Sequence, residues 1–219
     1  SPLEWNYRNH VQFHLTAEGR IGFINSRGYS TLPIEECHLP EMGINTFWPD
    51  LQFESNEGVE RVSLRSGQDE ELMVILESEN PETPELEIEA DVSVVHLFDD
   101  HPVVIAGESH LSMKIADREF RVSAASFFQV NTKMAEKMTG HLAEKLPFIE
   151  SATLLDVYCG VGLFSAFFAG KYQRVIGIES SESACEDFAF NLDEFDNVEL
   201  YEGEAETIGG DVHFAGGAQ

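Results

Sequence analysis

Short runs of alternating apolar and polar residues fill most of the first half of the chain. In segment 9–15, Val11, Phe13 and Leu15 alternate with polar residues, the pattern of a half-buried strand. Further strand-like runs, separated by turn residues, cover residues 20–25, 59–64, 71–76, 92–97, 103–106, 111–115 and 119–122. Segment 38–51 has partly helical spacing, broken by a Gly and a Pro. We therefore expect residues 1–123 to form a β-rich α+β domain.

The hydrophobic pattern changes after residue 123. Residues 132–146 carry apolar positions at i, i+4 spacing, which predicts a helix with Thr132 as a candidate N-cap. Residues 153–158 are almost continuously apolar, as a buried parallel strand requires. The chain then reads as helix, strand, helix and strand over residues 163–169, 174–179, 181–195 and 197–201. This order predicts an α/β fold, with part of a doubly wound, Rossmann-like sheet in residues 124–219.

A sheet of only three parallel strands has an unpaired edge. Such an edge presents free backbone N–H and C=O groups and invites pairing with another strand. We therefore expect a homo-oligomer, or another form of strand pairing, through the exposed sheet edge.

Composition indicates an ordinary globular protein with an unusual charge. Hydrophobic residues make up 42% of the chain, and no apolar run reaches the roughly 18 residues of a membrane span. There are 40 Asp and Glu against 13 Lys and Arg, a formal net charge of -27. This charge repels polyphosphates, so the chain alone should bind nucleic acid poorly. Three widely spaced Cys predict no disulfide framework and favour a reducing cytoplasm, and no His pair has a zinc-like spacing.

The candidate chemistry lies where the first predicted parallel strand turns into a helix. Segment 156–162 (DVYCGVG) contains two glycines, which permit a tight turn and close approach of a ligand to the backbone. Glu179 ends the next strand, where a carboxylate can accept hydrogen bonds from ribose hydroxyls. A dinucleotide fold would have a third Gly where Ser165 stands, whereas an acidic residue such as Asp156 before the glycines favours S-adenosylmethionine. A nicotinamide oxidoreductase, a non-catalytic binding module and a glycine turn without ligand remain alternatives.

Three segments together carry a family resemblance. Residues 126–131 (SFFQVN), 156–162 and 175–179 (VIGIE) resemble the RNA uracil-5-methyltransferase family. The resemblance extends upstream to Tyr7-Arg8-Asn9 and to Glu36-Cys37-His38-Leu39, and covers nearly the whole chain. It implies a class I methyltransferase domain that transfers a methyl group from S-adenosylmethionine to carbon 5 of a uridine in rRNA or tRNA.

The resemblance also implies roles for individual residues. Gln129 would contact the methionine end of the methyl donor, and Asp156 would belong to the same site. Tyr158 and the Gly160 backbone would line the binding loop, and Glu179 would hold the ribose.

No catalytic residue is expected within these 219 residues. The family's attacking cysteine lies in a Ser-Cys-Asn-Pro segment that this sequence does not contain, and its base lies later still. We therefore expect a piece of a longer enzyme that is inactive by itself, with Cys159 packing the loop. Cys37 stands where iron–sulfur members of the family place their last cluster ligand. A cluster needs four ligands, so one could form only in the full-length parent, and no metal site is expected here.

Overall fold

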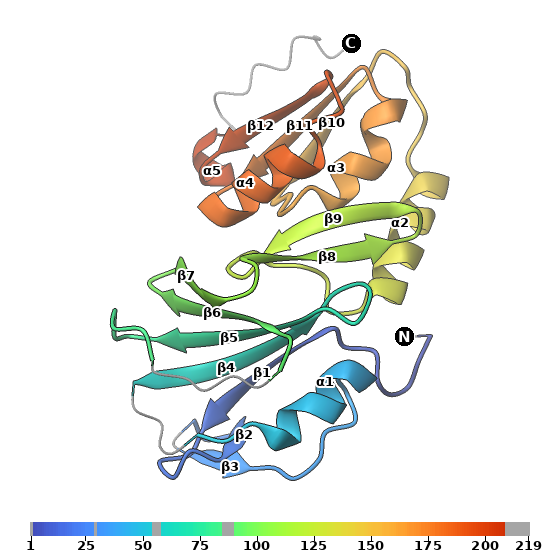
Figure 1. The fold of residues 1–219 in the computed structure, drawn as a ribbon. Helices are drawn as coiled ribbons and strands as arrows, with labels where there is room; N and C mark the ends of the chain where they lie inside the picture. Colours follow the sequence, from blue (N-terminus) through green and yellow to red (C-terminus); the bar gives the residue numbers. More distant parts are fainter. Residues whose placement is uncertain (1, 29, 54–57, 85–89, 209–219) are drawn as a thin grey trace. The chain divides into compact units, whose positions relative to one another are not determined.

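The computed structural model describes residues 2–28, 30–53, 58–84 and 90–208 (Figure 1). Contacts divide the chain into two compact units. Unit 1 consists of residues 1–118 and 129–135, and unit 2 of residues 119–128 and 136–219. The domain boundary that the sequence predicts after residue 123 stays a prediction.

Unit 1 is built on a seven-stranded sheet with the order β3-β2-β1-β4-β5-β6-β7. Neighbouring strands are antiparallel except β5 and β6, which are parallel. The strands are β1 (His10–Leu15), β2 (Ile21–Ile24), β3 (Thr31–Pro33), β4 (Val59–Ser66), β5 (Leu72–Ser78), β6 (Ser93–Phe98) and β7 (His101–Ala106). The sheet confirms the strands predicted from alternation in this half of the chain.

The apolar residues that alternate with polar ones along the strands form the core of unit 1. Val11, Phe13 and Leu15 of β1 are buried in one hydrophobic cluster with Val62 and Leu64 of β4. Helix α1 (Met42–Phe47) and the 3-10 turn η1 (Trp48–Asp50) contribute Ile44 and Trp48 to the same cluster. Only part of the helical spacing of segment 38–51 therefore becomes helix.

The chain continues through a hairpin and a long helix. Strands β8 (His110–Ile115) and β9 (Arg118–Ser123) form a two-stranded sheet, with Ala116 at a φ of 54° in the predicted turn. Helix α2 spans Thr132–Lys145. Its cap differs from the predicted one, because Oδ1 of Asn131 accepts a 3.0 Å hydrogen bond from the backbone N–H of Met134. An Asn one residue before the helix satisfies this otherwise unpaired N–H, so Thr132 becomes the first helical residue.

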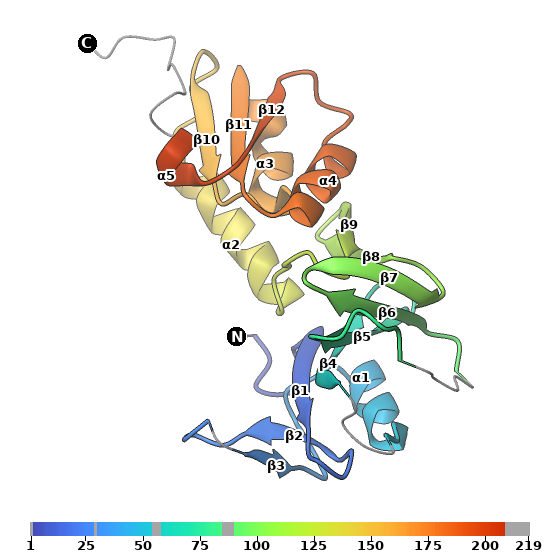
Figure 2. The same cartoon turned by 90° about the vertical axis from the view of Figure 1, so that its left-hand side faces the viewer.

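Unit 2 contains a three-stranded parallel sheet with the order β10-β11-β12. The strands are β10 (Thr153–Val157), β11 (Arg174–Glu179) and β12 (Val198–Glu202), and the connecting elements are α3 (Leu163–Phe168), the 3-10 turn η2 (Ala169–Lys171), α4 (Glu182–Asn191) and the short α5 (Ala205–Ile208). The predicted order of strand, helix, strand, helix and strand is confirmed. Figure 2 shows α3 and α4 together on one side of this sheet.

The central strand β11 is buried on both faces. Ile176 and Ile178 pack with residues of α5, among them Ile208. On the other face, a Cβ at Gly177 would lie 2.8 Å from the ring of Phe188 in α4. Glycine is therefore needed at this position for α4 to approach the strand so closely.

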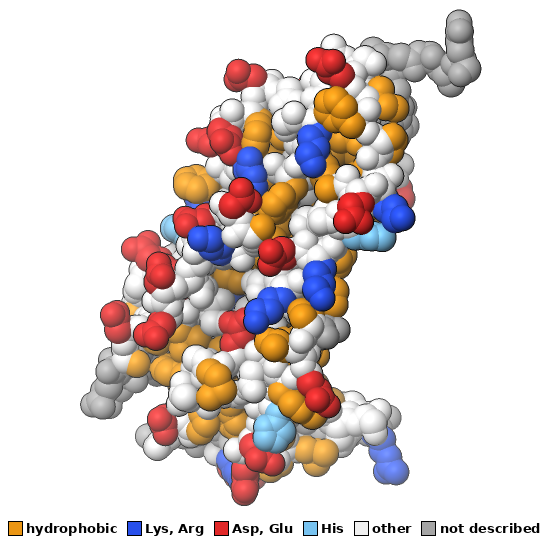
Figure 3. Space-filling view, turned by 90° about the vertical axis from the view of Figure 1, so that its right-hand side faces the viewer, with side chains coloured by type: hydrophobic (Ala, Val, Ile, Leu, Met, Phe, Trp, Pro, Cys, Tyr) orange, Lys and Arg blue, Asp and Glu red, His pale blue; other side chains and the backbone are white. Residues whose placement is uncertain are grey.

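The acidic side chains of one face do not gather into a single patch (Figure 3). On the face drawn in Figure 3, Asp and Glu side chains are scattered among Lys, Arg and apolar side chains. No helix within the described ranges is long and apolar enough to cross a membrane.

Candidate functional site

The loop from Tyr158 to Gly162 joins β10 to α3 and has an unusual backbone. Tyr158, Gly160 and Gly162 have φ values of 61°, 54° and 88°, in the left-handed region that favours glycine. A Cβ at Gly162 would lie 2.2 Å from Cδ1 of Leu192, so glycine is required there on two counts. A Cβ at Gly160 would meet no atom within 4 Å. The backbone at Gly160 is thus open to the approach of a ligand.

The carboxylate of Glu179, at the end of β11, is held by three backbone N–H groups. Oε2 accepts a 2.9 Å hydrogen bond from Gly160, and Oε1 accepts bonds of 2.8 and 3.0 Å from Ser180 and Ser181. Ser181 is the N-cap of α4, and the positive end of a helix dipole favours a carboxylate there. A carboxylate can accept about four hydrogen bonds, so these three fix its orientation and leave room for one more donor.

Asp156 is tied to the first turn of α3. Its Oδ2 accepts hydrogen bonds from the backbone N–H of Ser165 at 3.0 Å and from its hydroxyl at 2.7 Å. Burial raises the pKa of Asp156, and the bonds from Ser165 oppose part of that rise. Ser165, which stands in place of the third glycine of a dinucleotide fold, therefore orders the turn through its side chain.

Tyr158 projects from the loop and is 67% exposed. Its hydroxyl donates a 2.8 Å hydrogen bond to Oε1 of Glu206 in α5. That bond to a negative group raises the pKa of Tyr158 and lowers the pKa of Glu206. Because β11 lies between β10 and β12, the bond spans the carboxyl end of β11, where Glu179 is located. Glu206 was not predicted from the sequence, because nothing local marks an acid 48 residues away as the partner of Tyr158.

Comparison with known proteins decides the family. A family model described as tRNA (uracil-5-)-methyltransferase matches residues 89–212, more than half of the chain. The chain belongs to this family. The methyltransferase chain is 29% identical over 214 residues to an RNA methyltransferase of Streptomyces coelicolor described as uncharacterized, covering 93% of this chain and 45% of that protein. It is 38% identical over 107 residues to the tRNA (uracil-5-)-methyltransferase homolog B of Danio rerio, covering 48% of this chain and 22% of that protein.

A solved structure supports the fold. The tRNA (uracil-54, C5)-methyltransferase of Pyrococcus abyssi, in complex with S-adenosyl-L-homocysteine, superposes with a TM-score of 0.67 at 21% identity, covering 93% of this chain and 57% of that one. This likeness confirms the predicted class I methyltransferase fold. The methyltransferase chain spans about half the length of the curated relatives it matches.

The structure places four of the five predicted donor-site residues in unit 2. Tyr158 and Gly160 lie in the loop, Asp156 is the second-last residue of β10, and Glu179 is the last residue of β11. Gln129 belongs to unit 1, where its backbone carbonyl accepts a 2.9 Å hydrogen bond from Nδ2 of Asn9. Its side chain remains a predicted contact of the methyl donor.

The cysteines of the methyltransferase chain are unpaired and differ in accessibility. Cys159 is 6% exposed, and its pKa is raised first by burial and then by the charges of Asp156 and Glu179. Burial likewise raises the pKa of Cys185 to about 11. A thiol held protonated is a poor nucleophile, which agrees with the prediction that Cys159 packs the loop. Its role stays a prediction. Cys37 is half-buried against the core of unit 1, and the described residues contain no group of three metal-ligating side chains.

Proposed function

We propose that the protein to which this chain belongs transfers a methyl group from S-adenosylmethionine to carbon 5 of a uridine in rRNA or tRNA. The observation that carries the proposal is the Glu179 carboxylate, fixed by three backbone N–H groups beside the open backbone of Gly160. The family, whose model is described as tRNA (uracil-5-)-methyltransferase, supports the choice of reaction and of RNA as substrate.

The residues present fit S-adenosylmethionine, which supplies an activated methyl group when bound. Glu179 has acceptor capacity left for one ribose hydroxyl, on the oxygen that Gly160 already bonds. Two carboxylates, Asp156 and Glu179, close to one loop favour a ligand that carries a positive sulfonium. Tyr158 offers an exposed ring beside this loop, and Gln129 would receive the amino-acid end.

The 219 residues alone should bind the methyl donor without turning it over. They contain no Ser-Cys-Asn-Pro segment, and Cys159 is too buried and too weakly acidic to replace its cysteine. In a longer protein, activity would depend on a cysteine and a base outside these 219 residues. An iron–sulfur cluster there would need three ligands besides Cys37. The reducing cytoplasm that free thiols favour, and a homo-oligomer formed through the sheet edge, also stay predictions.

Calorimetry with S-adenosylhomocysteine tests the proposal directly. We expect the chain to bind this product of methyl transfer and not to bind NAD. Binding of NAD in its place would make the chain a nicotinamide-binding fold. Methyl transfer to uridine-containing RNA by the 219 residues alone would overturn the assignment of the catalytic groups to other segments.

A further inference from the structure

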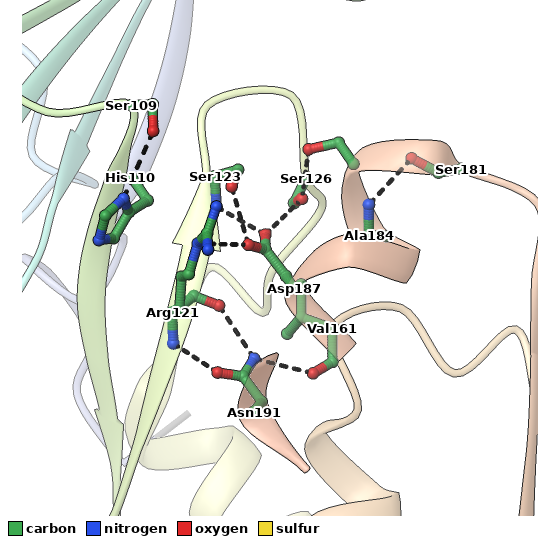
Figure 4. A network of polar contacts seen from close by, with 11 residues as sticks. Ser109, His110, Arg121, Ser123, Ser126, Val161, Ser181, Ala184, Asp187 and Asn191 are labelled. Carbon is green, nitrogen blue, oxygen red and sulfur yellow. Dashed lines mark hydrogen bonds and ion pairs between the residues drawn. The ribbon is translucent and has the colours of Figure 1, made fainter. Parts of the chain in front are cut away.

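The last residue of α4 is bonded to the glycine loop. Nδ2 of Asn191 donates a 3.0 Å hydrogen bond to the backbone carbonyl of Val161, which lies between Gly160 and Gly162 (Figure 4). The same amide donates at 3.0 Å to the carbonyl of Arg121 in β9, and its Oδ1 accepts at 2.7 Å from the backbone N–H of Arg121. Asn191 thus uses its acceptor oxygen and both amide protons to hold two backbone segments.

One turn earlier, Asp187 anchors the same face of α4. Its side chain is completely buried, and it accepts hydrogen bonds from the N–H and the hydroxyl of Ser123 at 2.7 and 2.8 Å and from the hydroxyl of Ser126 at 2.6 Å. Nε of Arg121 lies 3.1 Å from Oδ1 of Asp187. A buried carboxylate with this many donors holds its helix in one position, because any shift would leave a charge unpaired. Figure 4 shows Asp187 and Asn191 on successive turns, facing the same segment.

The loop depends on few such bonds. Its positive φ values interrupt any regular backbone ladder, and the space beside Gly160 contains no packing atom within 4 Å. Within the loop, Cys159 N–H bonds to Ile178 and Gly162 N–H bonds to the carbonyl of Cys159. Val161 is buried, so its carbonyl would lose its hydrogen bond inside the protein if the Asn191 amide were removed.

We propose that Asn191 is a positioning residue for the methyl-donor site. By fixing the carbonyl of Val161, it keeps the neighbouring Gly160 amide directed at Oε2 of Glu179. Helix α4 then holds the site from both ends, since the N–H of Ser181 at its start bonds to Oε1 of the same carboxylate. The inference rests on the proposed function, in which that carboxylate binds the donor.

A matched pair of variants tests it. Asn191→Asp keeps the size and the acceptor but removes both N–H donors. Asn197→Asp makes the same change at the opposite end of the strands, where Nδ2 donates at 2.8 Å to the carbonyls of Ala169 and Tyr172. We expect both variants to lower the melting temperature. Only Asn191→Asp should weaken S-adenosylhomocysteine binding, by about tenfold, the effect of losing one buried hydrogen bond.

The control separates positioning from stability. Equal losses of affinity in the two variants, or unchanged affinity in both, would overturn the proposal. If Asn191→Asp does not fold, Asn191→Ala makes the comparison with Asn197→Ala without an added charge. If the wild-type chain binds no S-adenosylhomocysteine, the proposed function fails. Amide NMR then tests separately whether Asn191 positions the backbone amide of Gly160. The Gly160 resonance should then shift in the Asn191 variant and not in the Asn197 variant, and a Gly160 resonance unchanged in both would refute it.

Discussion

The backbone N–H of Gly160 donates a 2.9 Å hydrogen bond to Oε2 of Glu179, joining the loop after β10 to the last residue of β11. The two groups stand 19 residues apart in the sequence, and neighbouring parallel strands bring them together. The carboxylate is thereby oriented before any ligand arrives, which reduces the entropy that binding must overcome.

Replacing Glu179 by Gln should therefore impair donor binding strongly. The amide keeps the shape but loses the charge and one acceptor, and its NH₂ group would face backbone donors. We expect the affinity for S-adenosylhomocysteine to fall by at least about tenfold, as for loss of a charge-assisted hydrogen bond. Glu202→Gln, which removes the same charge at the end of β12, is the control. A Glu179→Gln protein that binds as well as the control would exclude Glu179 from the site.

Replacing the glycine at position 162 should destabilise the fold. Gly162→Ala combines a φ of 88° with a Cβ 2.2 Å from Leu192, so we expect a loss of about 2 kcal/mol or more in the free energy of unfolding. Gly170→Ala is the comparison, because a Cβ there meets nothing within 4 Å. Urea denaturation of both variants measures the difference. Similar stabilities would show that the loop adapts to a side chain.

Local patterns were sufficient to predict every strand of the described residues except the short β3. Alternation places Val11 and Phe13 in the core of unit 1, and the apolar run of residues 153–158 predicts β10 because a strand buried on both faces needs no alternation. The three-residue strand β3 was missed, because Thr31–Pro33 is too short to show a period. The N-cap of α2 was displaced by one residue, since Asn and Thr are both good caps.

The site was predictable only where a motif is local. The glycine loop and Glu179 could be predicted because the glycines indicate a tight turn and the apolar runs indicate where the strands end. Asn191 and Glu206 could not, because their partners Arg121 and Tyr158 lie 70 and 48 residues away. The packing of α4 and α5 brings these polar groups together. The hydrophobic periodicity of the sequence does not predict such contacts.

Stability should fall as the pH drops below about 6.5, in part because of His10. Burial, with the charges of Arg65 and Arg8, lowers the pKa of His10 in β1 to about 3. The folded protein keeps this imidazole neutral while the unfolded chain takes up a proton, so between pH 6.5 and 3 protonation favours unfolding by ~1.4 kcal/mol per pH unit. Urea denaturation at pH 7 and pH 5 should show a loss of ~2 kcal/mol from this group.

His10→Gln should remove that part of the pH dependence. His141→Gln, at an exposed position of α2, should leave it unchanged. If His10→Gln shows the full wild-type loss between pH 7 and pH 5, the folded protein protonates His10 readily and the proposed burial effect is absent.

The thiols should react with an alkylating or disulfide reagent in a fixed order. Cys37 is half-buried, whereas Cys159 and Cys185 are buried and their pKa values are raised, so few thiolates form at neutral pH. We expect Cys37 to be labelled first, and Cys37→Ser to leave a folded protein that reacts only slowly until denaturant is added. Cys159→Ala should bind S-adenosylhomocysteine within about twofold of wild type, since its sulfur is buried and would lie 2.9 Å from a Cβ at Gly177 of β11. Rapid labelling of Cys159 in folded Cys37→Ser would instead show an accessible thiolate beside Glu179, and the attacking cysteine would have to be sought in this loop.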